Sequence, residues 1–222
     1  MLPDLDAANT VQMNSDTQFP TLVKLIKSLD TAAISQERKH ALKPLIDYIQ
    51  NKVESNQNIR LNFICTHNSR RSHLSQVWAQ TIAAYFDIDK VSAYSGGTEA
   101  TALFPIVAAT LSDQGFKIDK LSNFENPIYA IKYADNEAAI IGFSKRFDHS
   151  FNPKSNFAAI LTCSSADKGC PFIMGAEERI PILFEDPKTF DNSPVQKEKY
   201  LEKSIEIASE LFYVFNQINN SI

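Results

Sequence analysis

Residues 59–72, IRLNFICTHNSRRS, decide the fold of this chain. Residues 59–64 alternate in polarity and end at Cys65, which is typical of a β-strand. A short polar loop follows, and apolar side chains then recur at helical spacing over residues 72–86. A strand, a tight loop and a helix in this order predict the start of an α/β unit.

Cys65 is the candidate nucleophile. The loop after it leads into a helix N-terminus, whose free N–H groups and dipole attract an anion. The same field is expected to lower the pKa of the thiol from its ordinary value of about 8.5 and so to favour a thiolate. Arg71 can fold back to bind two oxygens of a tetrahedral oxyanion, and Ser72 can donate its hydroxyl to the thiolate. The alternative is a buried structural cysteine before a basic helix start.

The whole loop is predicted to bind the oxyanion. Asn68 tolerates the left-handed backbone geometry that so tight a loop requires. Two side chains keep open alternatives. His67 either fills space or adds positive electrostatic potential at the anion site. Arg70 either faces solvent or adds positive potential there. The predicted oxyanion-binding residues are Thr66, His67, Asn68, Ser69, Arg70, Arg71 and Ser72.

Three more predicted strands end in residues suited to chemistry. Residues 91–95 run into Gly96 and Gly97, residues 156–162 into Cys163, and residues 180–184 into Glu185, Asp186 and Pro187. Helical patterns at 104–114 and 197–216 complete the α/β organisation. Ligands of such a sheet bind beyond the carboxyl ends of its strands. We therefore expect Cys65, Cys163 and Asp186 to lie on one rim.

Asp186 is the candidate general acid. A carboxylic acid beside a bound oxyanion can protonate a leaving oxygen, and Pro187 stiffens the loop that carries it. Asp-Pro is also an ordinary turn signal, which is the alternative interpretation.

Cys163 and Cys170 are a candidate redox pair. The six residues between them, SSADKG, form a loop flexible enough to bring the two sulfurs together. The alternatives are two incidental cysteines or half of a metal site. A metal site would need a nearby C-x2-C or histidine pair, so no metal is predicted.

Composition restricts the partners and the compartment. A net charge of -4 and a pI near 5.6, with dispersed Lys and Arg, predict no binding to nucleic acid or to an anionic membrane. No apolar run is long enough to span a membrane, and the N-terminus lacks the features of a secretory signal. Three cysteines do not make a disulfide framework, so we expect a cytoplasmic protein with catalytic or redox thiols.

The α/β pattern occupies residues 58–222, the predicted catalytic domain, and residues 1–57 are predicted to be an N-terminal helical extension. Amphipathic helices at 19–29 and 35–53 suit packing or a homodimer contact, and Pro44 should kink or split the second. Within the catalytic domain, residues 122–152 predict an inserted β-hairpin. Its expected strands are 129–133 and 138–144, around a turn at 134–137.

Four motifs carry a resemblance: CTHNSRRS at 65–72, SGGTEAT at 95–101, TCSSADKGCP at 162–171 and EDP at 185–187. Together they resemble the low-molecular-weight protein tyrosine phosphatase superfamily, in particular its thioredoxin-coupled arsenate reductases. The resemblance covers residues 58–215. It implies a four-stranded parallel sheet flanked by helices, with Cys65 as nucleophile, Arg71 as oxyanion clamp and Asp186 as general acid.

The resemblance further implies a thiol relay without a bound cofactor. The Cys65 thiolate attacks arsenate with loss of water, assisted by Asp186. Cys163 then attacks the Cys65 sulfur and releases arsenite, and Cys170 passes the disulfide on to thioredoxin or a similar dithiol.

Two alternatives stay open. The first is a phosphatase acting on phosphotyrosine, which would use Cys65, Arg71 and Asp186 and let water resolve the phosphocysteine. The second is a non-enzymatic redox sensor, in which Cys163 and Cys170 switch a surface.

Overall fold

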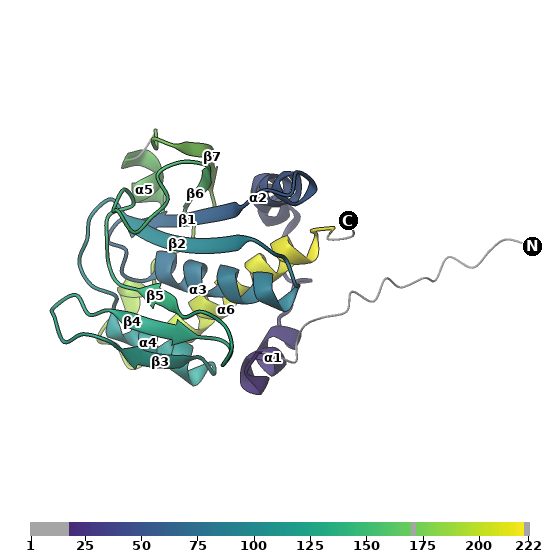
Figure 1. Cartoon of the computed structure of the whole chain (residues 1–222). Coiled ribbons are helices and arrows are strands. Elements are labelled where there is room, and N and C mark those ends of the chain that lie inside the picture. Colours follow the sequence, from purple (N-terminus) through teal and green to yellow (C-terminus); the bar gives the residue numbers. More distant parts are fainter. Residues whose placement is uncertain (1–17, 170–171, 220–222) are drawn as a thin grey trace, which may run out of the picture.

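A four-stranded parallel sheet forms the centre of the molecule (Figure 1). The computed structural model describes residues 18–169 and 172–219. The strands lie in the order β2-β1-β6-β7, with bounds β1 (Ile59–Cys65), β2 (Val91–Gly97), β6 (Phe157–Leu161) and β7 (Ala176–Pro181). The predicted α/β class, with a four-stranded parallel sheet flanked by helices, is confirmed.

The last strand differs from its prediction. β7 begins at Ala176 and ends at Pro181, whereas residues 180–184 were expected. The early part, AEER, is mostly charged and so gives no apolar signal, but an edge strand tolerates such residues because one side faces water. Ile182 and Phe184 still donate backbone hydrogen bonds to Leu161 and Thr162, so the chain continues along the sheet toward Asp186.

Helices cover both faces of the sheet unequally. The main hydrophobic core lies between one face and the helices α2 (Gln36–Glu54), α3 (Arg71–Tyr85) and α6 (Gln196–Asn216). Trp78 of α3 is fully buried in this core and donates to Ser204 Oγ of α6 at 2.9 Å. A smaller cluster on the other face contains Ile64, Leu161 and the short helix α5 (Ser164–Gly169).

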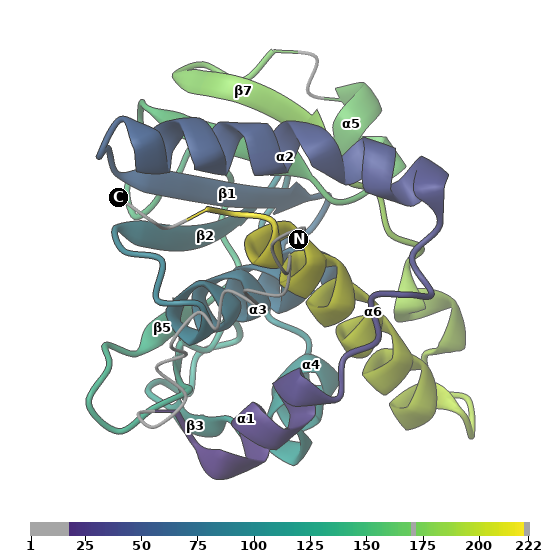
Figure 2. The same cartoon turned by 90° about the vertical axis from the view of Figure 1, so that its right-hand side faces the viewer.

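The N-terminal helices are part of the main core. Leu22 and Ile26 of α1 (Pro20–Lys27) and Leu45 of α2 are fully buried in it, and Figure 2 shows α2 running alongside the sheet. Pro44 was expected to kink or split this helix. α2 continues through Pro44, so the split is wrong, because a packed apolar face outweighs one lost backbone hydrogen bond. The division of the chain at residue 57 stays a prediction.

A second, antiparallel sheet confirms the predicted hairpin. β4 (Tyr129–Lys132) pairs with β5 (Ile140–Gly142), and a third strand that was not predicted, β3 (Lys117–Lys120), pairs with β4. Figure 1 shows this sheet beside α4 (Pro105–Asp113). In the described part of the chain, no helix has the length and apolar character of a membrane span.

Candidate active site

The loop from Cys65 to Ser72 connects β1 to α3 and has the backbone of an anion-binding site. Its carbonyl groups face away from its centre: Thr66 O accepts from Glu99 N at 2.8 Å, and His67 O accepts from Ser144 Oγ at 2.8 Å. The backbone N–H groups of residues 66–71 have no hydrogen-bond acceptor within the described residues. Donors gathered in one loop at a helix N-terminus are suited to a tetrahedral oxyanion.

Gly97 allows the end of β2 to pack against this loop. It is paired with Cys65 in the parallel ladder. A Cβ at Gly97 would lie 2.3 Å from Glu99 O and 2.7 Å from both Asn68 N and Thr66 O. Only glycine fits there, so the loop shape depends on this position.

Asn68 and Ser72 connect the loop to the candidate nucleophile. Asn68 has a φ of 44°, the left-handed geometry predicted for it. Its Oδ1 accepts from Lys145 N at 2.9 Å, and its Nδ2 donates to Ser72 Oγ at 2.9 Å. Ser72 Oγ lies 3.1 Å from the sulfur of Cys65, a residue that is 4% exposed. Because Asn68 already donates to the hydroxyl oxygen, the hydroxyl proton is available to the sulfur.

Arg71 and Asp186 are in direct contact. Arg71 begins α3 and is buried; its Nη1 donates to Phe184 O at 2.8 Å and its Nη2 to Asp186 Oδ2 at 2.5 Å. Asp186 is the N-cap of the 3-10 helix η1 (Pro187–Phe190), where its Oδ1 accepts from Lys188 N at 3.1 Å. The two residues predicted as clamp and acid, 115 positions apart, are thus brought together.

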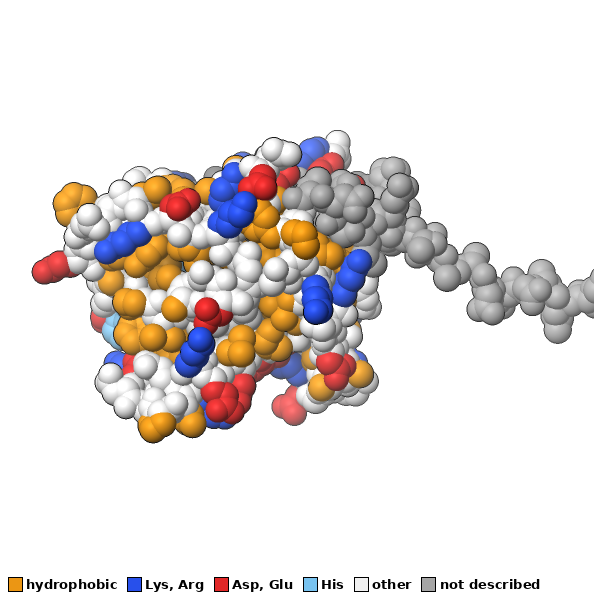
Figure 3. Space-filling view, turned by 90° about the horizontal axis from the view of Figure 1, so that it is seen from below, with side chains coloured by type: hydrophobic (Ala, Val, Ile, Leu, Met, Phe, Trp, Pro, Cys, Tyr) orange, Lys and Arg blue, Asp and Glu red, His pale blue; other side chains and the backbone are white. Residues whose placement is uncertain are grey.

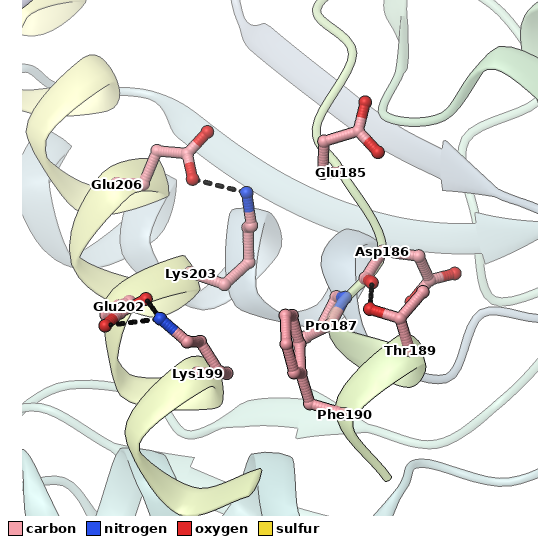
Figure 4. Close-up of a pocket in the computed structure, with 9 residues that line it drawn as sticks. All are labelled: Glu185, Asp186, Pro187, Thr189, Phe190, Lys199, Glu202, Lys203 and Glu206. Carbon is pink, nitrogen blue, oxygen red and sulfur yellow. Dashed lines mark hydrogen bonds and ion pairs between the residues drawn. The ribbon is translucent and has the colours of Figure 1, made fainter. Parts of the chain in front are cut away.

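A cavity of about 370 Å³ borders Asp186 between η1 and α6 (Figure 4). Its two cationic side chains, Lys199 and Lys203, are paired with Glu202 and Glu206. A cation already neutralised by a carboxylate attracts a further anion weakly. The loop at Cys65, and not this cavity, is therefore the better candidate for oxyanion binding.

Cys163 lies beside the loop, at the end of the strand next to β1. Its sulfur is 3.4 Å from Thr66 Oγ1 and accepts from Ala166 N at 3.4 Å. It is 2% exposed and packs in the same buried cluster as Cys65. Cys170, the predicted third thiol, lies outside the described residues.

Arg70 differs from both alternatives considered for it. Its side chain is 11% exposed, so it does not face solvent. Its guanidinium donates to Tyr200 of α6 and is paired with Asp191, the residue that ends η1, so its charge is already neutralised by a carboxylate. His67 remains partly exposed, with its Nδ1 3.3 Å from Glu99 Oε2.

Two buried titratable side chains behind the loop were not predicted as functional. Lys145 is 1% exposed, and burial lowers its pKa to about 7. Burial, and then the charge of Lys145, lower the pKa of His73 to about 3, so His73 is neutral at physiological pH. His73 Nδ1 lies 3.2 Å from Ser95 Oγ. In the sequence, Lys145 stands beside another cation, Arg146, and nothing there separates it from a surface lysine.

No family model matches the chain, but curated relatives do. Arsenate reductase 2 of Staphylococcus epidermidis is 27% identical over 125 residues, which cover 56% of this chain and 76% of that protein. The arsenate reductase of Staphylococcus aureus is 27% identical over 150 residues, covering 68% and 92%. The resemblance to arsenate reductases is confirmed by these matches.

Solved structures also match the chain at lower identity. An arsenate reductase in a phosphate-binding state is 17% identical with a TM-score of 0.47, covering 72% of this chain and 99% of the other. A low-molecular-weight phosphotyrosine phosphatase from Vibrio cholerae is 13% identical with a TM-score of 0.47, covering 71% and 94%.

Proposed function

We propose that this chain, an enzyme related to the arsenate reductases and low-molecular-weight phosphatases, reduces arsenate to arsenite through Cys65, Cys163 and Cys170 in turn. The observation that supports this choice is the position of Cys163. Hydrolysis through a phosphocysteine does not require a second buried thiol beside the anion loop. Reduction requires one, because a second thiol must supply electrons.

The first step forms a bond from sulfur to arsenic without a change in oxidation state. The Cys65 thiolate attacks arsenate, and one hydroxyl group of the arsenate leaves as water after accepting a proton from Asp186. The loop N–H groups and Arg71 hold the remaining oxygens, so Arg71 must turn from Asp186 toward the oxyanion.

The second step is the reduction. The Cys163 thiolate attacks the Cys65 sulfur, a disulfide forms, and the electron pair of the breaking sulfur–arsenic bond leaves with arsenic as arsenite. Cys170 then attacks Cys163, which frees Cys65 and leaves a disulfide between Cys163 and Cys170. An external dithiol of the thioredoxin kind reduces this disulfide, and no bound cofactor is needed.

The compartment and assembly of the enzyme are also proposals. A cytoplasmic location suits the relay, because reducing dithiols are available there. A homodimer through the N-terminal helices has less support, since the apolar residues Leu22, Ile26 and Leu45 are already buried within the chain.

Phosphomonoester hydrolysis is the second candidate. It is favoured by the contact between Arg71 and Asp186, which completes a phosphatase site without Cys163. Water would then replace Cys163 as the group that attacks the covalent intermediate. The same loop can support weak hydrolysis in a reductase, so the presence of hydrolysis does not by itself separate the two functions.

The decisive experiment follows arsenate-dependent NADPH oxidation with thioredoxin and thioredoxin reductase. Wild type should turn over arsenate, and Cys163→Ser and Cys170→Ser should lose this turnover while keeping hydrolysis of an aryl phosphate. Cys65→Ser should lose both activities. Hydrolysis in wild type without arsenate turnover would instead assign the chain as a phosphatase.

A further inference from the structure

Arg70 and Asp191 form a partly buried ion pair next to the proposed catalytic residues. Arg70 Nη2 donates to Asp191 Oδ2 at 2.6 Å, and Arg70 Nε donates to Tyr200 OH at 2.5 Å. The Tyr200 hydroxyl in turn donates to Asp191 Oδ1 at 2.6 Å. The three side chains close a triangle, which the Phe104 ring covers with its centroid 4.1 Å from the Arg70 guanidinium carbon.

The charges in this triangle are well defined. Burial alone would raise the pKa of Asp191, but hydrogen bonds from Tyr200 and Gln196 and the charge of Arg70 outweigh it and hold that pKa below its usual value. Burial, and then the hydrogen bond to Asp191, raise the pKa of Tyr200. At neutral pH Asp191 is therefore ionised and Tyr200 keeps its proton, which makes the bonds to Asp191 charge-assisted.

Asp191 and Asp186 stand at the two ends of one short segment. Asp186 is the N-cap of η1 and Asp191 is its C-cap. Asp186 pairs with Arg71, and Asp191 pairs with Arg70. Two consecutive arginines of the anion loop thus hold the two ends of the segment that carries the candidate acid.

We propose that Arg70 is a positioning residue that holds Asp186 at the oxyanion through Asp191. This inference rests on the proposed role of Asp186 as general acid. When an oxyanion binds the Arg71 guanidinium, Asp186 loses its ion-pair partner in the anion loop. The pair of Arg70 and Asp191 then remains as the connection between the acid segment and the loop, and its low exposure protects it from solvent screening.

The benefit of a positioned acid depends on the leaving group. As the Cys65 sulfur bonds to phosphorus in an aryl phosphate, the ester P–O bond breaks and Asp186 transfers its proton to the departing oxygen. An acidic phenol such as p-nitrophenol leaves without that proton, whereas phenol itself needs it. A misplaced acid therefore slows phenyl phosphate selectively.

The test compares kcat/KM for phenyl phosphate and p-nitrophenyl phosphate in Arg70→Gln, Asp191→Asn and the double variant. For phenyl phosphate we expect a loss of about tenfold or more, with little change for p-nitrophenyl phosphate. The loss of kcat/KM for phenyl phosphate in the double variant should be no larger than the loss in the more affected single variant, because the two side chains act as a unit. Arg70→Lys, which keeps the charge, should recover part of the loss.

Two controls accompany these variants. Asp186→Asn should show the same selectivity for the leaving group. Arg179→Gln, which removes the ion pair between β7 and Asp167 of α5 and leaves both η1 pairs in place, should affect neither ester. Equal losses for both esters in Arg70→Gln would overturn the positioning role.

A measurement independent of activity separates this inference from the proposed function. Amide hydrogen exchange over residues 186–191 should be faster in Arg70→Gln than in wild type. If wild type processes neither ester nor arsenate, the proposed function fails. Faster exchange in Arg70→Gln would still show that the pair of Arg70 and Asp191 holds the segment 186–191. Unchanged exchange in Arg70→Gln would overturn the positioning role of Arg70, whatever activity the variant has.

Discussion

Ser72 Oγ lies 3.1 Å from Cys65 Sγ, and the same oxygen accepts a hydrogen bond from Asn68. The hydroxyl proton is therefore directed to the sulfur, where it would stabilise the negative charge of the proposed nucleophile. We expect Ser72→Ala to lower kcat/KM for an aryl phosphate about tenfold to a hundredfold, as a hydrogen bond to a charged group contributes about 1.5–3 kcal/mol. Ser75→Ala is the matched control, because Ser75 Oγ donates to Arg71 O within the helix and, among the described residues, to no other group of the loop. A similar loss in both variants would contradict a specific role for Ser72.

Gly97 supports a second prediction. A Cβ there would lie 2.3 Å from Glu99 O, so Gly97→Ala must displace the loop backbone. We expect a loss of about a hundredfold in kcat/KM for an aryl phosphate, together with a lower Tm. At Gly169 a Cβ would meet no atom of the described residues within 4 Å, and Gly169→Ala should leave hydrolysis and Tm unchanged. Wild-type activity in Gly97→Ala would show that the loop tolerates the shift.

Lys145 predicts a pH dependence of stability. Burial lowers its pKa from 10.5 to about 7, so between these values the unfolded chain binds a proton that the folded chain does not. The contribution of Lys145 to the free energy of unfolding therefore rises with pH across this window and is least favourable below it. We expect Lys145→Met to be more stable than wild type near pH 6, with the difference shrinking toward about pH 9.5.

Urea unfolding at both pH values measures this difference. Lys117→Met, which changes a lysine that is 59% exposed, should give no comparable pH dependence. A stability difference for Lys145→Met that stays constant with pH would mean that the amine does not titrate in this range.

Leu45 tests whether α2 belongs to the folding unit. Its side chain is fully buried in the core that also contains Phe63 and Trp78. We expect Leu45→Ala to lower the free energy of unfolding by about 2–5 kcal/mol in a single urea transition. Lys43→Ala on the exposed face of the same helix should change it by less than about 0.5 kcal/mol. Separate transitions for α2 and the sheet would show instead that the helix is an independent appendage.

Sequence patterns predicted where most residues of the candidate site lie, because these residues stand at the ends of strands. Cys65 and Cys163 directly follow apolar strand patterns, and the rule for parallel sheets places them on one rim. The pattern could not give the partner of Arg70, because Asp191 is 121 residues away and only the packing of η1 against α6 brings it near. Lys145 was missed for a similar reason, since burial of a lysine depends on the whole fold.

Tertiary contacts also explain why two secondary-structure elements were predicted wrongly. Strand β7 was misplaced because its first residues are charged, and the split predicted at Pro44 did not allow for the packing of Leu42 and Ile49 on either side of it. Local propensity is a weak guide wherever tertiary contacts decide.

Cys65 ends β1 and Cys163 follows β6, and these two strands are hydrogen-bonded neighbours. The separation of neighbouring strands, about 4.8 Å, is a fixed property of a sheet, so the backbone itself keeps the two thiols near each other. In evolutionary terms, an oxyanion enzyme built on this sheet can gain or lose reducing chemistry by exchanging the side chains at positions 163 and 170, without rebuilding the loop that binds the anion. Few substitutions would then separate a hydrolytic enzyme on this sheet from a reductase.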